Sequence, residues 1–334
     1  MAQRPLGVIL TGGLGTRLRP LTPATPKALV PLLNRPLLAY ALDLFAGFGL
    51  TDTVIVVSGA HEGVAEAAAA LAPPGLAVSI AEQLRPLGIG DAVTSAGSAL
   101  DGRTVVVLAI DTILIGDCRP ALDAFERAQA DAGLLLHATD RPREMGIAVL
   151  EGDRIVDLVE KPEQPRSTLA AVGLWMLGPA AVERLRRDPS TRADGEIDLT
   201  GTIAEMLADG ADVRGWKLDG EWLDTGAVPS LLSTQARLLA DLRPAPPDAK
   251  GTRIEGVVAV GEDARITHST LHGPMLIGAG AEIEHCELGP NVVIGDGARL
   301  RSVRLSDAMV TAGTTLERVT HTGVVVNASN EVGP

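Results

Sequence analysis

The sequence predicts a doubly wound, mostly parallel α/β domain followed by a parallel β-helix. From residue 6 to about residue 243, short apolar runs typical of buried strands alternate with segments whose apolar residues recur at helical spacing. Beyond residue 250 the chain instead repeats itself every 17 residues. A proline-rich stretch separates the two parts. We therefore expect a first domain over residues 1–243, a linker over 244–250 and a β-helix domain over 251–334.

The α/β part begins with an apolar run at 6–10, which is too short for a helix and fits a buried parallel strand. Three glycines follow it, and Asp111 follows a later strand. Ligands of doubly wound sheets bind beyond the carboxyl ends of the strands, so we expect the glycines and Asp111 at one edge. The elements expected up to Asp111 are strand 6–10, helix 37–49, strand 53–58, helix 61–72, strand 76–80, helix 91–100 and strand 104–108.

Residues 134–177 differ in style, because four strand-like runs follow one another with few helices between them. This pattern predicts a smaller subdomain over the mouth of the sheet, where a second substrate could bind. Two helices, at 201–208 and 229–242, are expected to complete the domain. The four runs are 134–138, 146–150, 154–159 and 172–177.

The repeat beyond the linker consists of aliphatic residues every five or six positions, often followed by glycine or another small residue. This pattern resembles the hexapeptide repeat of left-handed parallel β-helices, in which three sides of about six residues make one coil. The register weakens after residue 310, and residues 327–334 carry no signal. The matched positions, each 17 apart, are Val260, Ile277 and Ile294, then Ile266, Ile283 and Leu300, then Leu271, Leu288 and Leu305.

The bulk composition excludes several classes. A formal net charge of −13 argues against a nucleic-acid partner, although local cations can still bind a nucleotide. Cys118 and Cys286 are too few and too far apart for a disulfide framework or a metal cluster. The chain shows no leader pattern and no run of about 18 apolar residues, so we expect a cytoplasmic protein without a membrane partner.

The glycine loop comprises Gly12, Gly13 and Gly15, followed by Thr16 and Arg17. Glycines let several backbone N–H groups approach phosphate oxygens, and nearby cations can balance the phosphate charge. The loop is not a P-loop, because it lacks the lysine followed by serine or threonine. It is not the dinucleotide fingerprint either, because the third glycine and the later acidic residue are missing.

The loop does resemble the sugar-1-phosphate nucleotidyltransferases, or NDP-sugar pyrophosphorylases. Their signature is Gly-Gly-x-Gly-Thr-Arg-Leu-x-Pro-Leu-Thr and then Pro-Lys, and residues 12–22 with 26–27 meet every position. A turn that only packs a strand against a helix is the alternative, and the complete signature disfavours it. The resemblance extends over nearly the whole chain and is greatest to the long form of the glucose-1-phosphate thymidylyltransferases. It implies a Rossmann-like catalytic domain followed by a left-handed β-helix.

The resemblance implies a site for a nucleoside triphosphate. Gln83 would pair with the edge of the base, and Gly88 would let the backbone approach it. Without the resemblance, Gln83 is an ordinary polar residue at the end of a strand. Gln83 alone does not separate dTTP, UTP, GTP and ATP. The implied nucleotide-binding residues are Leu10, Gly12, Gly13, Gly15, Thr16, Arg17, Gln83 and Gly88.

A second motif, Glu160-Lys161-Pro162, matches the family's acceptor site. There the glutamate accepts hydrogen bonds from sugar hydroxyls and the lysine binds the sugar phosphate. Neighbouring Glu and Lys are more often a surface ion pair, so the order of motifs carries this assignment. The implied sugar-phosphate residues are Gly146, Glu160, Lys161, Val172 and Gly173.

The resemblance also implies a Mg²⁺ site formed by Asp111 and by Asp224 of the Trp222–Gly226 segment. A lone aspartate after a strand is more often a helix cap, but Mg²⁺ prefers carboxylates together with phosphate oxygens. The implied catalytic residues are Arg17, Lys27, Asp111 and Asp224. With Lys161 they would neutralise charge while the acceptor phosphate attacks the α-phosphorus and pyrophosphate leaves.

Three departures from the family pattern fall on the acceptor side: Ile110 and Thr112 around Asp111, Met145, and 89–91. They favour an unusual acceptor, such as a modified sugar or a cyclitol phosphate. The alternative is a catalytically silent relative that binds a sugar nucleotide and regulates a partner. A third interpretation makes a β-helix histidine an acyltransferase base. The family resemblance further implies a homo-oligomer, either a dimer or a tetramer.

Overall fold

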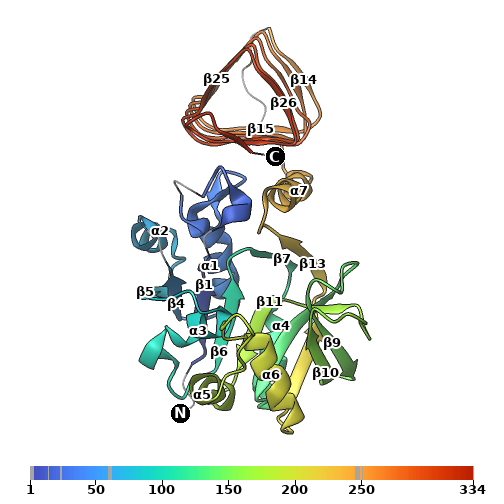
Figure 1. The fold of residues 1–334 in the computed structure, drawn as a ribbon. Coiled ribbons are helices and arrows are strands. Elements are labelled where there is room, and N and C mark those ends of the chain that lie inside the picture. The colour runs from blue at the N-terminus through green and yellow to red at the C-terminus, as the bar shows by residue number, and fades with distance from the viewer. Residues whose placement is uncertain are drawn as a thin grey trace. The chain divides into compact units, whose positions relative to one another are not determined.

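The computed structural model describes residues 4–13, 15–22, 25–58, 62–244, 249 and 251–333. These residues form two compact units. The first contains the described residues of 1–13 together with 38–223, and the second contains those of 14–37 together with 224–334. Figure 1 shows the sheet and helices of the first unit and the triangular coils of the second. The predicted linker is largely outside the described residues, and the predicted domain limits stay a prediction.

The first unit is built on a nine-stranded sheet. Strand β1 is buried along its whole length and pairs in parallel with β4 and β6, and β4 pairs in parallel with β5. Strand β11 joins this parallel part antiparallel to β6, so the sheet is mixed. The strand order is β5 (Ala77–Glu82), β4 (Asp52–Val57), β1 (Leu6–Leu10), β6 (Val105–Ala109), β11 (Leu169–Leu177), β8 (Ala132–Ala138), β12 (Val213–Lys217), β10 (Arg154–Glu160) and β9 (Gly146–Glu151).

Helices cover both faces of this sheet, as the doubly wound prediction requires. On one face, apolar residues of α3 (Ile89–Thr94), α5 (Pro179–Arg187) and α6 (Leu199–Ala208) pack against alternate residues of β1 and its neighbours. On the other face, the Phe45 ring of α1 (Leu37–Gly47) occupies the space where a Cβ on Gly7 would lie. The unit also contains α2 (Val64–Leu71) and α4 (Arg119–Ala128), and α4 packs its Phe125 against Trp216 of β12.

Two expectations for this unit are wrong. The predicted helix over 91–100 is broken into α3 and a 3-10 turn at Gly97–Leu100. The hydroxyls of Thr94 and Ser95 donate to the carbonyl oxygen of Asp91 at 3.0 and 2.9 Å, and Gly97 has φ +62°. Local hydroxyl bonds of this kind compete with helix continuation.

The predicted subdomain is also absent from the described residues, because β8 to β11 are part of the nine-stranded sheet. Strand β12 lies between β8 and β10 and pairs with both. Strand β12, which comes from residues 213–217, thus lies among the four strands that the sequence pattern grouped as a subdomain. Helices α4 and α5 were not predicted. A two-stranded sheet of β7 (Thr112–Gly116) and β13 (Gly220–Asp224) completes the elements that bear on the site.

The second unit contains the left-handed β-helix (Figure 1), with three sheets as its sides. Their strands are parallel except for the last one, β28 (Val332–Gly333), which pairs antiparallel with its neighbour. Strand pairs such as Arg253 with Thr270 and Arg265 with Glu282 confirm the 17-residue repeat. From Val293, which pairs with Met309, each coil is 16 residues long. The weakened register after residue 310 therefore reflects a change to 16-residue coils, and the β-helix continues beyond it. The sides begin with β14 (Arg253–Glu255), β15 (Val258–Val260) and β16 (Arg265–Thr267) and end with β26 (Thr320–Thr322), β27 (Val325–Val326) and β25 (Thr315–Glu317).

Segment 15–37 and helix α7 (Val228–Leu239) are hydrogen-bonded to the β-helix. The amide nitrogen of Asn34 donates to the carbonyl of Ile294 at 2.8 Å, and that of Asn327 donates to the carbonyl of Pro20 at 3.0 Å. Gln235 of α7 donates to two further β-helix carbonyls. The β-helix is therefore directly bonded to the segment that carries part of the sequence signature. No helix in the described part of the chain is long and apolar enough to cross a membrane.

Candidate active site

The site begins where β1 and β6 end. Leu10 and Ala109 are paired in register, and the N–H of Ile110 donates to the carbonyl of Leu10 at 3.1 Å. Gly12 and Asp111 thus follow adjacent parallel strands at the carboxyl edge of the sheet. This is the edge at which doubly wound sheets bind ligands, and it is where the sequence placed both residues.

A pocket of about 220 Å³ opens beside the glycine loop. Five of the predicted nucleotide-binding residues line it: Leu10, Gly12, Gly13, Gln83 and Gly88. Its other lining residues are Pro86, Ile89, Ala92, Arg192, Glu196, Ile197 and Asp198. The first unit therefore gathers residues from three separate stretches of sequence around one cavity.

Gln83 follows the edge strand β5 and is buried, with 5% of its surface exposed. Its side-chain nitrogen donates to Asp91 Oδ2 at 2.8 Å and to the carbonyl of Gly88 at 3.2 Å. Gly88 has φ +95°, and a Cβ on it would lie 2.7 Å from the carbonyl oxygen of Ile197. Only glycine suits that position, because both the backbone conformation and the close approach exclude a side chain.

Glu160 and Gly146 lie opposite each other in the β9–β10 hairpin. A Cβ on Gly146 would lie 2.9 Å from Glu160 Oε2, so the glycine makes room for the carboxylate. Lys161 adopts φ +47°, and its N–H donates to the carbonyl of Met145 at 3.0 Å. Its Nζ lies 3.9 Å from Glu160 Oε1. Three of the acceptor residues implied by the resemblance, Gly146, Glu160 and Lys161, thus lie together at the open end of this hairpin.

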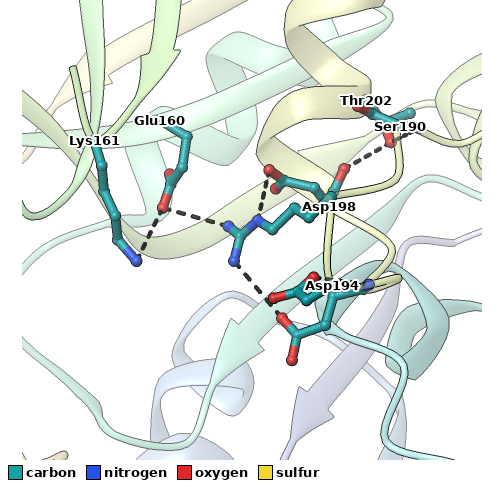
Figure 2. A network of polar contacts seen from close by, with 8 residues as sticks. Glu160, Lys161, Ser190, Asp194, Asp198 and Thr202 are labelled. Atoms are coloured by element: carbon teal, nitrogen blue, oxygen red, sulfur yellow. Dashed lines mark hydrogen bonds and ion pairs between the residues drawn. The ribbon is translucent and has the colours of Figure 1, made fainter. Parts of the chain in front are cut away.

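The loop between α5 and α6 connects this acceptor group to the pocket. Arg192 pairs through Nε with Asp198 at 3.0 Å, through Nη2 with Glu160 at 3.4 Å and through Nη1 with Glu196 at 3.7 Å. Figure 2 shows Glu160 and Asp198 on either side of this guanidinium. The N–H of Ile197 donates to the carbonyl of Leu87 at 2.7 Å, which fixes the loop against the Gln83–Gly88 segment.

The charges around Glu160 act on its pKa in opposite directions. Burial raises the pKa of this carboxyl, and the negative charge of Asp198 raises it further. Arg192 and Lys161 lower the same pKa, but they do not cancel the rise. Glu160 is therefore a carboxyl whose protonation depends on its two cationic neighbours.

Val172 and Gly173 lie beside the residue that follows Asp111. The hydroxyl of Thr112 donates to the carbonyl of Val172 at 3.2 Å. Gly173 has φ +75° in an irregular part of β11, and a Cβ there would collide with the Thr112 hydroxyl. The predicted sugar-phosphate residues Val172 and Gly173 are thus in contact with β7, which starts directly after the predicted metal ligand Asp111.

The remaining predicted residues, Gly15, Thr16, Arg17, Lys27 and Asp224, belong to the second unit. Gly15 has φ +56° and its carbonyl accepts a bond of 2.7 Å from the hydroxyl of Thr22, a member of the same signature. Arg17 is exposed on a short 3-10 turn (Thr16–Leu18), and Lys27 begins a second one (Lys27–Leu29).

Asp224 and Asp111, the two predicted metal ligands, are in different units. Asp224 Oδ1 accepts the N–H of Gly226 at 3.0 Å. Among the described residues, no group of three or more His, Cys, Asp and Glu side chains is suited to a metal. The Mg²⁺ site of Asp111 and Asp224 stays a prediction.

Sequence reasoning missed Arg192, Glu196 and Asp198, and it treated Asp91 only as a departure from the family pattern. The signal for the first three was an alternation of charged residues in the glycine-containing stretch 192–198, just before a helix. Nothing in the sequence relates Arg192 to Glu160, because that contact forms only when α6 packs beside β10.

A doubly wound sheet with a glycine loop and a pocket at the carboxyl ends of its strands is typical of nucleotide-binding α/β proteins. Residues 6–241 match the family model described as nucleotidyl transferase, and the chain belongs to that family. Within it, the chain is a sugar-1-phosphate nucleotidyltransferase, as its relatives indicate.

Similar proteins include the glucose-1-phosphate thymidylyltransferase of Streptomyces antibioticus, 37% identical over 80% of this chain and 76% of that protein. The mannose-1-phosphate guanyltransferase of Eremothecium gossypii is 30% identical over 78% of this chain and 73% of that protein. A solved Bacillus anthracis structure, assigned as a glucose-1-phosphate thymidylyltransferase and complexed with sucrose, has a TM-score of 0.64 and 26% identity. That similarity covers 72% of this chain and 98% of the other.

Proposed function

We propose that the protein joins a nucleoside triphosphate to a sugar 1-phosphate, or to a sugar-like cyclitol phosphate, in the manner of a glucose-1-phosphate thymidylyltransferase. The observation that carries this proposal is the continuous arrangement in the first unit. The pocket lined by Gln83 and Gly88 would hold the base, and Arg192, which also lines it, is paired with Glu160 of the Glu160–Lys161 segment that would hold the acceptor. Two substrates could therefore bind side by side at the carboxyl edge of the sheet.

The proposed reaction is a single in-line displacement. A phosphate oxygen of the acceptor forms a bond to the α-phosphorus, the bond between that phosphorus and the bridging β-phosphate oxygen breaks, and pyrophosphate leaves. The N–H groups of the glycine loop, with Arg17, Lys27 and Lys161, would hold and neutralise the phosphates. Glu160 would accept hydrogen bonds from acceptor hydroxyls. Catalysis then consists of positioning and charge neutralisation, with no covalent enzyme intermediate.

Asp111 and Asp224 fit Mg²⁺ by the chemistry of their donors. Both supply carboxylate oxygens, and Asp111 stands at the ligand-binding edge of the sheet. When bound, Mg²⁺ would supply charge neutralisation to the triphosphate and to the leaving pyrophosphate. Removal of the ion with a chelator should therefore abolish transfer, and added Mg²⁺ should restore it.

The acceptor is proposed to be an unusual sugar or cyclitol phosphate. The support comes from Thr112, whose hydroxyl is bonded to the backbone carbonyl of Val172, and from Met145 beside the acceptor turn. Similar turnover of glucose 1-phosphate and of every analogue would contradict this part of the proposal. We further propose a cytoplasmic homo-oligomer, a dimer or a tetramer, with no nucleic-acid or membrane partner. The net charge of −13 supports the absence of nucleic acid.

The experiment is a pyrophosphate-release assay with Mg²⁺, each of five nucleoside triphosphates and a panel of sugar and cyclitol 1-phosphates. Asp111→Asn is the matched control, because it removes one charge and changes the side-chain size very little. Release that requires an acceptor and disappears in the variant is the expected result. Tight nucleotide binding without release for any acceptor would instead favour a regulatory relative.

A further inference from the structure

The side chain of Gln83 has only one chemically sensible orientation. Its two candidate partners, the Asp91 carboxylate at 2.8 Å and the Gly88 carbonyl at 3.2 Å, are both pure acceptors. A carboxamide carries two N–H donors on nitrogen and only acceptors on oxygen. Turning the amide over would set its oxygen against a carboxylate and a carbonyl, so both of its N–H donors are committed to these groups.

The oxygen of the same carboxamide is directed to the glycine loop. A Cβ built on Gly12 would lie 3.2 Å from Gln83 Oε1, and both residues line the pocket. Within the described part of the chain, the structure gives Oε1 no hydrogen-bond partner. Only 5% of the surface of Gln83 is exposed, so its Oε1 is a well-fixed, unpaired acceptor in the pocket.

Asp91 is itself held firmly. Its carbonyl oxygen accepts the N–H of Ser95 at 3.0 Å and the Ser95 hydroxyl at 2.9 Å, in the first turn of α3. The preceding N–H, of Gly90, donates to the carbonyl of Ile197 at 3.0 Å. The backbone that carries this carboxylate is thus held both within α3 and by the loop that contains Ile197.

We propose that Asp91 is a positioning residue that fixes Gln83 as an acceptor and thereby selects nucleobases carrying a ring N–H. Thymine, uracil and guanine donate such a hydrogen. Adenine and cytosine present a ring nitrogen acceptor at that place, and the usual bidentate pairing of glutamine with adenine needs a free donor on the amide. This inference rests on the proposed function, because it assumes that the pocket receives the base of the nucleotide.

The test is equilibrium binding of nucleotides to the full chain, measured by titration calorimetry. UTP is compared with CTP, and inosine triphosphate with ATP, because each pair has one ring size and differs only at the edge facing Gln83. We expect the nucleotide with a ring N–H to bind about 10- to 100-fold tighter in each pair. In the other nucleotide, an acceptor nitrogen of the ring would face the buried acceptor oxygen of Gln83. Binding of both members within threefold would overturn the inference.

Asp91→Asn tests the positioning role. The amide of the new side chain can either accept or donate a hydrogen bond, so the carboxamide of Gln83 is free to rotate and exchange its oxygen and nitrogen. The UTP-to-CTP affinity ratio should fall about tenfold or more. Glu82→Gln is the matched control: it removes a neighbouring exposed carboxylate that has no bond to Gln83 among the described residues, and the ratio should not change. A merely structural role would weaken all four nucleotides equally and would overturn the inference.

If Asp91→Asn does not fold, Asp91→Ser replaces it, since serine also lacks a fixed acceptor at that distance. An unchanged ratio in a folded variant contradicts the proposal. Loss of pyrophosphate release with the binding ratios intact would contradict the proposed function but not this inference, because binding does not depend on transfer.

Discussion

Arg192→Ala should separate acceptor binding from nucleotide binding. Arg192 is 35% exposed and lies between Glu160, which is 25% exposed, and Asp198, which is 12% exposed. Its removal leaves neighbouring carboxylates without the cation between them. Because the group is partly screened by water, we expect a loss of about 1–2 kcal/mol of stability rather than the larger cost of a fully buried pair.

The same change should raise KM for the acceptor about tenfold, which corresponds to about 1.4 kcal/mol, with a much smaller change in KM for the nucleotide. The reason is that Glu160 loses the bond that orients it. Steady-state kinetics with each substrate varied in turn provide the measurement. Arg187→Ala is the control, since Arg187 is 81% exposed on α5 and its ion pair within the described residues is with Glu183, away from Glu160.

The pH profile adds an independent signature. Arg192 lowers the pKa of Glu160, so its loss should move that already raised pKa further up. A carboxyl whose pKa is higher in the folded than in the unfolded state binds its proton more tightly when the protein is folded. It therefore contributes stability at low pH, and this contribution is lost as the pH rises through the folded-state pKa. As the pH is lowered, kcat/KM for the acceptor should begin to fall at a pH above 4.5, the ordinary pKa of a glutamate. This acid limb of the pH profile should shift to higher pH in Arg192→Ala. Equal effects on both substrates, with no shift of the acid limb, would show that Arg192 does not orient Glu160 for the acceptor.

Other positions give further predictions. Gly88→Ala should cost about 2 kcal/mol or more and weaken nucleotide binding, because a Cβ would meet the Ile197 carbonyl. Gly75→Ala is the control, because Gly75 has φ +89° but an added Cβ there would meet no atom within 4 Å, so only backbone strain is shared. Equal losses of thermal stability and of nucleotide binding in the two variants would show that the contact with Ile197 does not matter. Asn327→Ala should speed hydrogen exchange in segment 15–22 without unfolding the β-helix, and unchanged exchange would show that its bond is dispensable. Burial raises the pKa of Cys118 to about 11, so its alkylation should be negligible at pH 8, and rapid labelling of the native protein there would contradict this.

The sequence predicts best what is local or periodic. The signature around Gly15 and the 17-residue repeat are both visible without tertiary information, and the structure bears out the loop position and the coils. The change from 17-residue to 16-residue coils blurs the repeat after residue 310, because each shorter coil shifts every later position by one more residue.

Contacts made across the fold could not be predicted in this way. Arg192 reaches Glu160 over 32 positions of sequence, and Asp91 reaches Gln83 across a turn that breaks the regular spacing. The prediction of a separate subdomain is wrong for a similar reason. Strand β12 inserts between β8 and β10, both of which come much earlier in the sequence. Element type follows from side-chain pattern, whereas strand order depends on which edges are free when the sheet assembles.

The proposed mechanism transfers the nucleotidyl group directly, in one step, to the acceptor phosphate. The most direct test uses a nucleoside triphosphate with sulfur at one defined α-phosphorus position and follows the configuration of the product by phosphorus NMR. One in-line displacement predicts an NDP-sugar or NDP-cyclitol with inverted configuration, formed together with pyrophosphate. Retention of configuration, or release of the nucleoside monophosphate to water, would contradict the account.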